Sequence, residues 1–405
     1  MQVLIIGGGA SGMMAALSAS ENPENQVTIL ERQNRVGKKL MATGNGRCNL
    51  TNRNLTLRNF HGTDAGFAEK ALSRFPVDAT LDYFAQLGLY TVTEEDGKVY
   101  PLSDQANSVV DTLRFALSQR GVTVITGCDV LSVRKKARGY KIVTTGEEYY
   151  ADKLIIAAGG CAGKTLGGTR SGYKLLESLG HSTTSLHPVL VQVKTDLTYV
   201  RSLKGVRADC AMTLKENGKT LAVQQGEVQF TDFGVSGPVT FSLSRLVSLA
   251  QGEQLLLLDF LRNYSENEIY ASLSARCGRF PKLEVEQLLT GMLNPRLGLA
   301  VLKFSQLDLK SELASLTEDS LKKIAHNLKF FPLQADGTLG MEHAQVTAGG
   351  VLTCDFRADT LESRKAPGVF VAGEVLDIDG DCGGYNLQWA WSSGYVAGKL
   401  GGKEG

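Results

Sequence analysis

The stretch Gln2-Val3-Leu4-Ile5-Ile6-Gly7-Gly8-Gly9-Ala10-Ser11-Gly12 decides the fold of this chain. Its apolar first half is typical of a buried strand, and an apolar helix start follows the glycines at residues 13–17. Strand, G-x-G-x-x-G and helix in this order are the fingerprint of a Rossmann βαβ unit. The first glycine allows the tight turn, the second lets the backbone approach a diphosphate, and the third lets the helix pack on the strand. The predicted diphosphate-binding residues are Gly7, Gly9, Ala10, Ser11 and Gly12.

A second predicted strand, residues 27–30, ends at an acidic residue. Glu31 follows Gly12 by about 20 positions, the spacing of the carboxylate that hydrogen-bonds the ribose of a dinucleotide. A carboxylate here disfavours a 2′-phosphate, because two negative groups would face each other. We assign Arg32 and Lys39 to the same cofactor site, although a lysine in a charged loop is equally compatible with a solvated side chain.

The C-terminal region favours FAD over NAD as the dinucleotide. A predicted strand at residues 368–372 leads into Gly373-Glu374, and Gly383-Gly384 turns into a predicted helix at residues 387–398. Glu374 is suited to accept hydrogen bonds from ribityl hydroxyls, and the positive end of the helix is suited to face N1 and O2 of a reduced flavin. The predicted FAD contacts here are Gly373, Glu374, Gly384, Tyr385, Asn386 and Leu387.

A second glycine-rich stretch, AGGCAGKT at residues 158–165, has the form of a phosphate-binding loop and raises the possibility of an ATPase. It follows short predicted strands between residues 122 and 157, and more glycines rather than an apolar helix come after it. The position of the first strand is already taken by residues 2–6. We therefore interpret Ala158, Gly159 and Gly160 as a turn beside FAD, Val130 as a further cofactor contact, and Lys164 as a loop lysine.

The polar loop GNGRCN, residues 44–49, is a further candidate for the flavin site. Gly46, Arg47, Cys48 and Asn49 either contact the flavin or the substrate, or only order the cavity. Cys48 as a redox thiol is the sharper hypothesis. Packing is the plainer one, because no second cysteine lies nearby in sequence.

Several long blocks give the chain a specific resemblance. IIGGGASGMMAA, GKKLMATGNGRCNLTN, GEVQFTDFGVSGP and FVAGEVLDIDGDCGGYNLQWAWSSGYVAG span nearly its whole length. In these blocks it resembles a bacterial flavoprotein family that includes aminoacetone oxidase-like and dehydro-bile-acid reductase-like proteins. The resemblance implies a glutathione-reductase-like FAD domain with an insertion and non-covalent FAD. Two positions depart from the pattern: Asp232 stands where many relatives carry His, and Ser171 where many carry Asp.

The predicted fold is α/β, a discontinuous FAD-binding Rossmann domain with an inserted β-rich module and a small helical module. We place the FAD domain at residues 1–188 and 343–405. Alternating segments and the Asn217-Gly218 turn predict a β-rich inserted domain at residues 189–262. Helical patterns such as residues 320–328 predict a mostly helical inserted domain at residues 263–342.

The predicted function is that of an FAD-dependent oxidoreductase in which NAD(P)H, as a transient co-substrate, drives reduction of an activated double bond in a small organic substrate. The open alternatives are a flavin amine oxidase that uses O₂, and an FAD-dependent RNA-modifying or flavin-binding regulatory protein. The helix start at Asn386 is expected to stabilise reduced flavin, with Arg47, Asp232 and Tyr385 near the substrate.

Bulk composition excludes several other classes. The net charge is +1, which favours neither nucleic acid nor an anionic membrane. The 7 cysteines and 5 histidines show no metal-ligand spacing. No apolar stretch is long enough for a membrane span, and a strand pattern begins directly after Met1 instead of a signal peptide. We therefore expect a cytoplasmic protein with no bound metal and no nucleic-acid partner, and a homodimer remains open.

Overall fold

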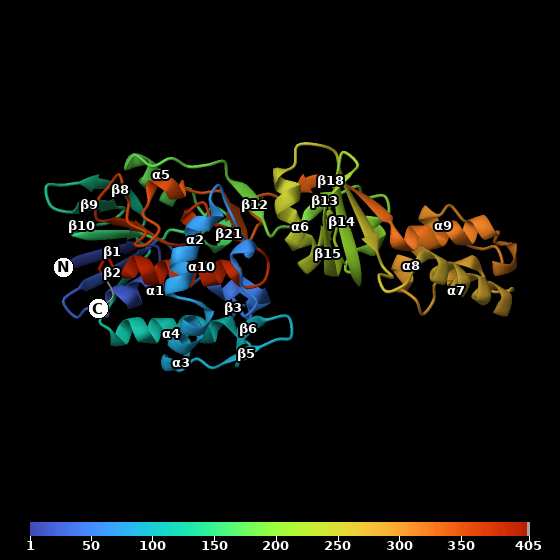
Figure 1. Cartoon of the computed structure of the whole chain (residues 1–405), viewed down its shortest axis with the longest axis horizontal. Coiled ribbons are helices and arrows are strands. Elements are labelled where there is room, and N and C mark those ends of the chain that lie inside the picture. The colour runs from blue at the N-terminus through green and yellow to red at the C-terminus, as the bar shows by residue number, and fades with distance from the viewer. Residues whose placement is uncertain (403–405) are drawn as a thin grey trace. The chain divides into compact units, whose positions relative to one another are not determined.

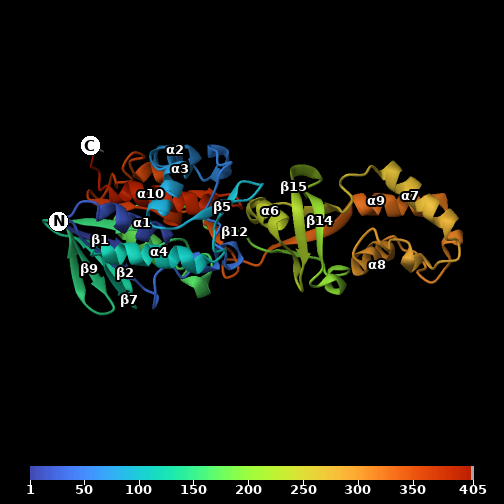
Figure 2. The ribbon, with the colours of Figure 1, turned by 90° about the horizontal axis from the view of Figure 1, so that it is seen from below.

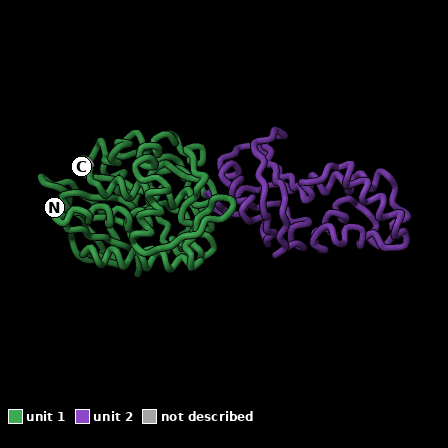
Figure 3. The backbone as a smooth tube through the Cα atoms, turned by 60° about the horizontal axis from the view of Figure 1, so that its bottom comes forward, with its two compact units in different colours: residues 1–188, 341–405 green, residues 189–340 purple. Residues whose placement is uncertain are grey.

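The computed structural model describes residues 1–402, which belong to two compact units. Unit 1 comprises Met1–Pro188 and the chain from Met341 onward, and unit 2 comprises Val189–Gly340 (Figure 3). Each unit has its own core of buried apolar side chains. Residues 403–405, the end of the segment that we assigned to the FAD domain, lie outside the described residues.

A parallel five-stranded sheet lies at the centre of unit 1 (Figure 1). Its order is β20-β11-β1-β2-β7. Its strands β20, β11, β1 and β2 are largely buried, as expected for a parallel sheet covered on both faces, whereas the edge strand β7 is mostly exposed. The C-terminal strand β20 pairs with β11 through Leu154 and Val369, which returns the end of the chain to the N-terminal sheet. The strands are β1 (Gln2–Ile6), β2 (Gln26–Glu31), β7 (Thr123–Thr126), β11 (Lys153–Ile156) and β20 (Val369–Val371).

Helices α1 (Ala10–Ala19) and α10 (Tyr385–Gly398) lie side by side against this sheet (Figures 1 and 2). Glycines permit the close approach, because a Cβ on Gly394 would collide with the carbonyl oxygen of Ser11 and one on Gly398 with that of Ala15. The first and last helices of the chain are thereby fixed to each other. The other helices of unit 1 are α2 (Ala68–Arg74), α3 (Val77–Gln86), α4 (Ala106–Gln119) and α5 (Ser171–Ser178).

Four small sheets complete unit 1. The sheet β10-β9-β8 contains the predicted strand at Val130, and the sheet β3-β6-β5 lies after the 3₁₀ segment Leu40–Gly46. Two-stranded pairs are formed by β4 with β21 and by β12 with β19. Their strands are β3 (Thr51–Asn52), β4 (Phe60–His61), β5 (Thr91–Thr93), β6 (Lys98–Pro101), β8 (Val130–Lys135), β9 (Tyr140–Thr144), β10 (Glu148–Ala151), β12 (His187–Val189), β19 (Val346–Ala348) and β21 (Asp379–Gly380).

Unit 2 is built on a closed barrel of order β13-β16-β15-β14-β17-β18. Asn217 and Gly218 both have positive φ, 49° and 80°, and form the predicted turn between β14 and β15. The barrel strands are β13 (Val193–Thr195), β14 (Arg207–Glu216), β15 (Lys219–Phe230), β16 (Gly234–Ser236), β17 (Gln254–Asp259) and β18 (Phe331–Thr338).

Helix α6 (Pro238–Leu249) packs on the barrel, and α7 (Glu266–Arg279), α8 (Pro295–Phe304) and α9 (Glu318–Lys329) form a helical part between β17 and β18. The range predicted as mostly helical, residues 263–342, therefore also contains the closing barrel strand β18.

The predicted Rossmann-type α/β fold with a β-rich insertion is confirmed. Within residues 1–402, no helix combines the length and apolar character needed to cross a membrane. The same residues contain no cluster of three or more His, Cys, Asp and Glu side chains with the geometry of a metal site.

Candidate functional site

The turn between β1 and α1 is shaped by its glycines. A Cβ on Gly7 would collide with the carbonyl oxygen of Ala157, and one on Gly12 with that of Gly7, so both positions exclude a side chain. A Cβ on Gly9 would instead meet nothing within 4 Å. Gly9 is also the N-cap of α1, and no side chain caps this helix. The first N–H groups of α1, including those of Ala10 and Ser11, are therefore left for an anionic ligand on the open side of Gly9.

The end of β2 brings the predicted ribose carboxylate to this turn. Glu31 accepts hydrogen bonds from the Gly8 backbone N–H at 2.7 Å and from the Gln33 N–H at 2.6 Å. Arg32 reaches across to the carbonyl oxygen of Gly167 at 3.1 Å. The carboxylate is thus held beside the glycine turn before any ligand binds, which is the placement a ribose contact requires.

Residues far apart in sequence meet around Glu374. Its carboxylate forms an ion pair with Lys39 at 2.9 Å and accepts a hydrogen bond from the Thr347 N–H at 2.8 Å. A Cβ on Gly160 would collide with both Glu374 and Thr347, so this glycine is required for close approach. The preceding residues Ala158 and Gly159 form the start of this turn, and a Cβ on Gly159 would meet nothing within 4 Å.

The start of α10 has the same character as the start of α1. Its N-cap, Gly384, has a φ of 98°, and no side chain caps the helix. The side-chain amide of Asn386 is engaged by Gly380, because it accepts from the N–H at 2.8 Å and donates to the carbonyl oxygen at 2.7 Å. Asn386 therefore fixes the loop, and the backbone N–H groups of Tyr385, Asn386 and Leu387 remain for a ligand.

A buried acceptor lies beside this helix start. Asn49 Oδ1 has no hydrogen-bond partner among the described residues, and a Cβ on Gly384 would stand 2.8 Å from it. An unsatisfied buried acceptor costs free energy unless a ligand supplies a donor. This feature fits a flavin, whose ring carries an N–H group.

Two further candidates in the loop at residues 44–49, Arg47 and Cys48, have different surroundings. Arg47 forms ion pairs with Glu94 at 2.8 Å and with Asp104, and its guanidinium stacks over Tyr100 at 3.9 Å. The hydrogen bonds to the two carboxylates raise the pKa of Arg47, so it is a permanent cation. Cys48 is fully buried, and this burial raises the pKa of its thiol to about 12, which opposes the thiolate that redox chemistry needs.

The remaining predicted residues stay predictions for different reasons. Gly46 has open space where a Cβ would stand, which is compatible with a close ligand. Val130 is buried in β8. Gly373 is held by α10, through its N–H to Ser393 Oγ at 2.8 Å and its carbonyl oxygen to Trp389 Nε1 at 3.1 Å. Asp232 belongs to unit 2, where it forms an exposed ion pair with Lys204 at 2.6 Å.

Sequence reasoning missed several side chains that organise this site. Thr347 Oγ1 accepts hydrogen bonds from the backbone N–H groups of Cys161 and Ala162, each at 3.0 Å, and so anchors the turn after Gly160. Ser393 and His61 were missed as well. Threonine and serine carry no motif of their own, so only their proximity in the fold reveals them.

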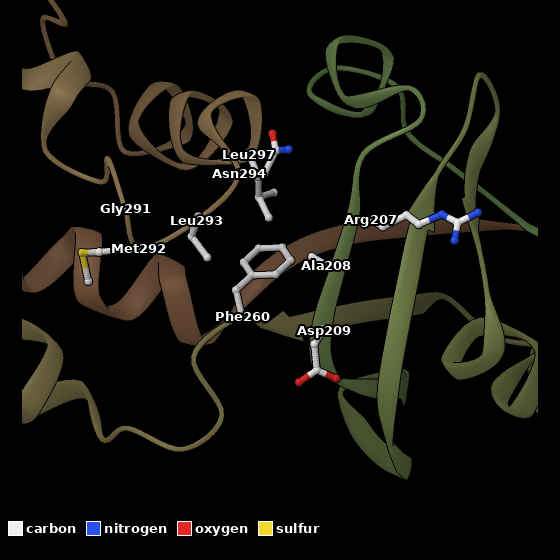
Figure 4. A pocket seen from close by; sticks show the side chains of 9 residues that line it. All are labelled: Arg207, Ala208, Asp209, Phe260, Gly291, Met292, Leu293, Asn294 and Leu297. Carbon is white, nitrogen blue, oxygen red and sulfur yellow. The ribbon is translucent and has the colours of Figure 1, made fainter. Parts of the chain in front are cut away.

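Unit 2 contains a separate pocket of about 320 Å³ between β14, the residues after β17 and the start of α8 (Figure 4). Phe260, Leu293 and Leu297 face one another in it, whereas the side chains of Arg207 and Asp209 point away from Phe260 (Figure 4). Asp209 is paired with Arg262 at 2.8 Å. The pocket is a crevice between the barrel and the helical part, and both apolar and polar residues line it.

The Rossmann fold, the two glycine-capped helix starts and the acidic residues beside them define a dinucleotide-dependent oxidoreductase. The chain belongs to the family described as HI0933-like protein Rossmann domain, whose model matches residues 1–400. It is an oxidoreductase that uses FAD, and the residues around Gly9 and Gly384 fit that cofactor.

Curated relatives cover nearly the whole chain. A 3-dehydro-bile acid delta(4,6)-reductase of Clostridium scindens is 39% identical over 98% of this chain and 97% of its own length. A ribosomal RNA dihydrouridine synthase of Escherichia coli is 30% identical over 97% of this chain and 96% of its own length. A protein of Haemophilus influenzae with the same name is 27% identical over the same shares of both chains.

Proposed function

We propose that this protein uses FAD to reduce a carbon–carbon double bond that is conjugated to a carbonyl group. The observation that carries the proposal is the bond common to its relatives. A delta(4,6)-reductase of a 3-dehydro-bile acid acts on double bonds in conjugation with a 3-ketone, and a dihydrouridine synthase acts on the uracil double bond in conjugation with a carbonyl.

When bound, FAD supplies the hydride for this reduction. The chain provides the binding and the electrostatics: the start of α1 holds the diphosphate, and Glu31 and Glu374 accept hydrogen bonds from sugar and ribityl hydroxyls. The positive end of α10 would stabilise negative charge on the flavin ring. The proposed electron donor is NADH or NADPH, which docks transiently because the chain has no second G-x-G-x-x-G unit.

As the substrate that contains this double bond, we favour a small organic enone or dienone, because the relative with 39% identity is named for such a substrate. The second candidate is a uridine in ribosomal RNA, which the names of two other relatives support. A net charge of +1 gives weak general attraction for RNA, so this candidate requires local contacts rather than a basic surface.

Anaerobic flavin spectroscopy tests the proposal. The purified holoprotein is mixed with NADH, NADPH or a panel of amines, and loss of the oxidised-flavin band at about 450 nm is followed. The reduced protein is then offered a steroid dienone acid, a simple cyclic enone or unmodified ribosomal RNA. Bleaching by a pyridine nucleotide and reoxidation by one of these acceptors is the expected result. Bleaching by amines alone would establish an oxidase instead, and a protein that binds no flavin would overturn the whole assignment.

A further inference from the structure

A histidine–carboxylate pair lies beside the start of α10. His61 Nε2 is 2.7 Å from Asp381 Oδ1, and the other carboxylate oxygen accepts a hydrogen bond from Asn59 Nδ2 at 3.1 Å. Because a carboxylate only accepts, the Nε2 position of His61 carries the proton. Nδ1 is then the ring nitrogen that does not face Asp381.

Backbone pairing ties this dyad to the flavin end of the site. Strand β4 runs antiparallel to β21, with His61 opposite Asp379. The carbonyl oxygen of Asp381 accepts from Asn386 Nδ2 at 3.3 Å, and its N–H donates to the Asn59 carbonyl oxygen at 2.9 Å. Asn386 belongs to the first turn of α10, so the dyad and that helix start form one connected piece.

The exposure of the two side chains suits a group that exchanges protons. His61 is 31% exposed and Asp381 is 42% exposed. The ring is therefore held by its partner and by the strand, yet solvent can reach it and return a proton after each turnover.

We propose that His61 is the acid that protonates the substrate in the reduction, an inference that rests on the proposed function. As the hydride from reduced FAD forms a bond to the β-carbon, the π electrons of the double bond take the proton from Nδ1 of the His61 imidazolium at the α-carbon. The product has gained one hydride and one proton, and His61 is left neutral with its Nε2 proton still on Asp381. Solvent then restores the imidazolium. Asp381 is a positioning residue, because its carboxylate orients the ring.

The chain offers a matched control for this role. His326 in unit 2 lies 3.3 Å from Glu266 and is 58% exposed, so it is also a histidine beside a carboxylate. It belongs to the helical part of unit 2.

The test compares His61→Gln, Asp381→Asn and His326→Gln as FAD-loaded proteins. Each is reduced with dithionite without oxygen, mixed with the enone that reoxidises the wild-type flavin, and followed at about 450 nm. His61→Gln is expected to slow reoxidation by about 100-fold, a usual share for general acid catalysis. Asp381→Asn, which keeps an acceptor for Nε2–H but removes the charge, is expected to slow it by about 10-fold. His326→Gln should react at the wild-type rate.

Two further readouts separate this role from a structural one. FAD affinity, measured by titrating the flavin-free proteins, should be the same in all variants. For reactions in D₂O, the wild type should place deuterium on one face of the α-carbon, and His61→Gln on both faces, because water replaces the positioned acid.

Each result has a distinct meaning. Wild-type reoxidation rate and single-face labelling in His61→Gln would overturn the role of His61 and leave the proposed function intact. Failure of the wild type with every conjugated acceptor would overturn the proposed function, and the role of His61 with it. If His61→Gln does not fold, Asp381→Asn decides, and an unchanged rate in that variant counts against the dyad.

Discussion

The helix starts of unit 1 that form the site differ from those of the helical part of unit 2. Helices α1 and α10 begin at Gly9 and Gly384 with no capping side chain. In contrast, Ser265 and Glu268 form a capping box at α7, and Thr317 caps α9. A capped helix satisfies its own N–H groups, whereas a helix that begins at glycine leaves them for something else. Helices α3 and α5 also have no side-chain cap, so the absence of a cap alone does not mark a site. Helix α6 of unit 2 also begins at a glycine, Gly237, with no side-chain cap, so a glycine at the cap does not mark a site by itself either. What marks α1 is the Glu31 carboxylate beside its glycine turn, and what marks α10 is the unpartnered Asn49 Oδ1 beside Gly384.

A side chain at position 9 that caps α1 should remove this difference between the helix starts. Of all the changes considered, we expect it to lower FAD affinity the most. The open space at Gly9 admits a side chain, and its φ of −79° is ordinary for any residue. In Gly9→Asp, the carboxylate would accept from the first-turn N–H groups and repel the diphosphate, so FAD affinity should fall by about 100-fold or more. The flavin-free protein should keep its thermal midpoint or gain slightly.

Gly9→Ala is the matched control for this prediction. Its methyl group enters the space that the diphosphate would occupy, but without charge or acceptor, so FAD affinity should fall by less than in Gly9→Asp. Both proteins are measured by FAD titration and by thermal unfolding without flavin. Equal losses in the two variants would show that steric exclusion, rather than the bare helix start, explains the effect.

Removing the cap of α7 is the reciprocal change. Ser265→Ala deletes the side chain that accepts from the Glu268 N–H at 3.3 Å, and the free energy of unfolding should fall by about 1 kcal/mol. FAD content should not change. Denaturant unfolding of the flavin-free protein measures the first quantity, and the flavin absorbance of the purified protein measures the second. A loss of flavin would contradict the division between structural and ligand-binding helix starts.

A contrast between local and long-range contacts explains which features of the fold and the site could be predicted from the sequence. The Rossmann unit, the return of the C-terminal strand and the Asn217-Gly218 turn follow from glycine spacing and apolar periodicity, which are local signals. Thr347 acts through partners that are distant in sequence, such as Cys161, so no local pattern predicts its role. Asn386 shows that a motif can predict the position of a residue without predicting what its side chain does. Asn386 was predicted at the helix start, but its side chain hydrogen-bonds Gly380 and holds that loop.

Cys48 offers a further test at the start of α10. It lies in the loop that also contains Asn49, whose Oδ1 is close to Gly384. Its thiol is fully buried, and Cys354 is exposed. At about pH 8, iodoacetamide should modify Cys354 in the folded protein and leave Cys48 intact, which peptide mass spectrometry can read.

Burial raises the pKa of Cys48 from 9.0 to about 12, so above pH 9 the unfolded chain loses this proton first. The contribution of Cys48 to stability is therefore complete below pH 9 and declines towards pH 12. Cys48→Ala should weaken that decline. Rapid alkylation of Cys48 in the folded protein would instead revive a redox role.

The smallest effect is expected at Lys164, in the stretch that has the form of a second phosphate-binding loop. Lys164 begins a 3₁₀ turn of 3 residues, its side chain is 77% exposed, and Glu342 lies 3.8 Å away. The loop has glycines and a lysine but no α-helix start to supply aligned N–H groups. Lys164→Ala should therefore leave FAD content and affinity unchanged. Lys39→Ala is the comparison variant: it removes the ion pair to Glu374 and should lower both FAD content and affinity. A marked loss of bound nucleotide in Lys164→Ala would mean that this loop, and not only the starts of α1 and α10, binds phosphate.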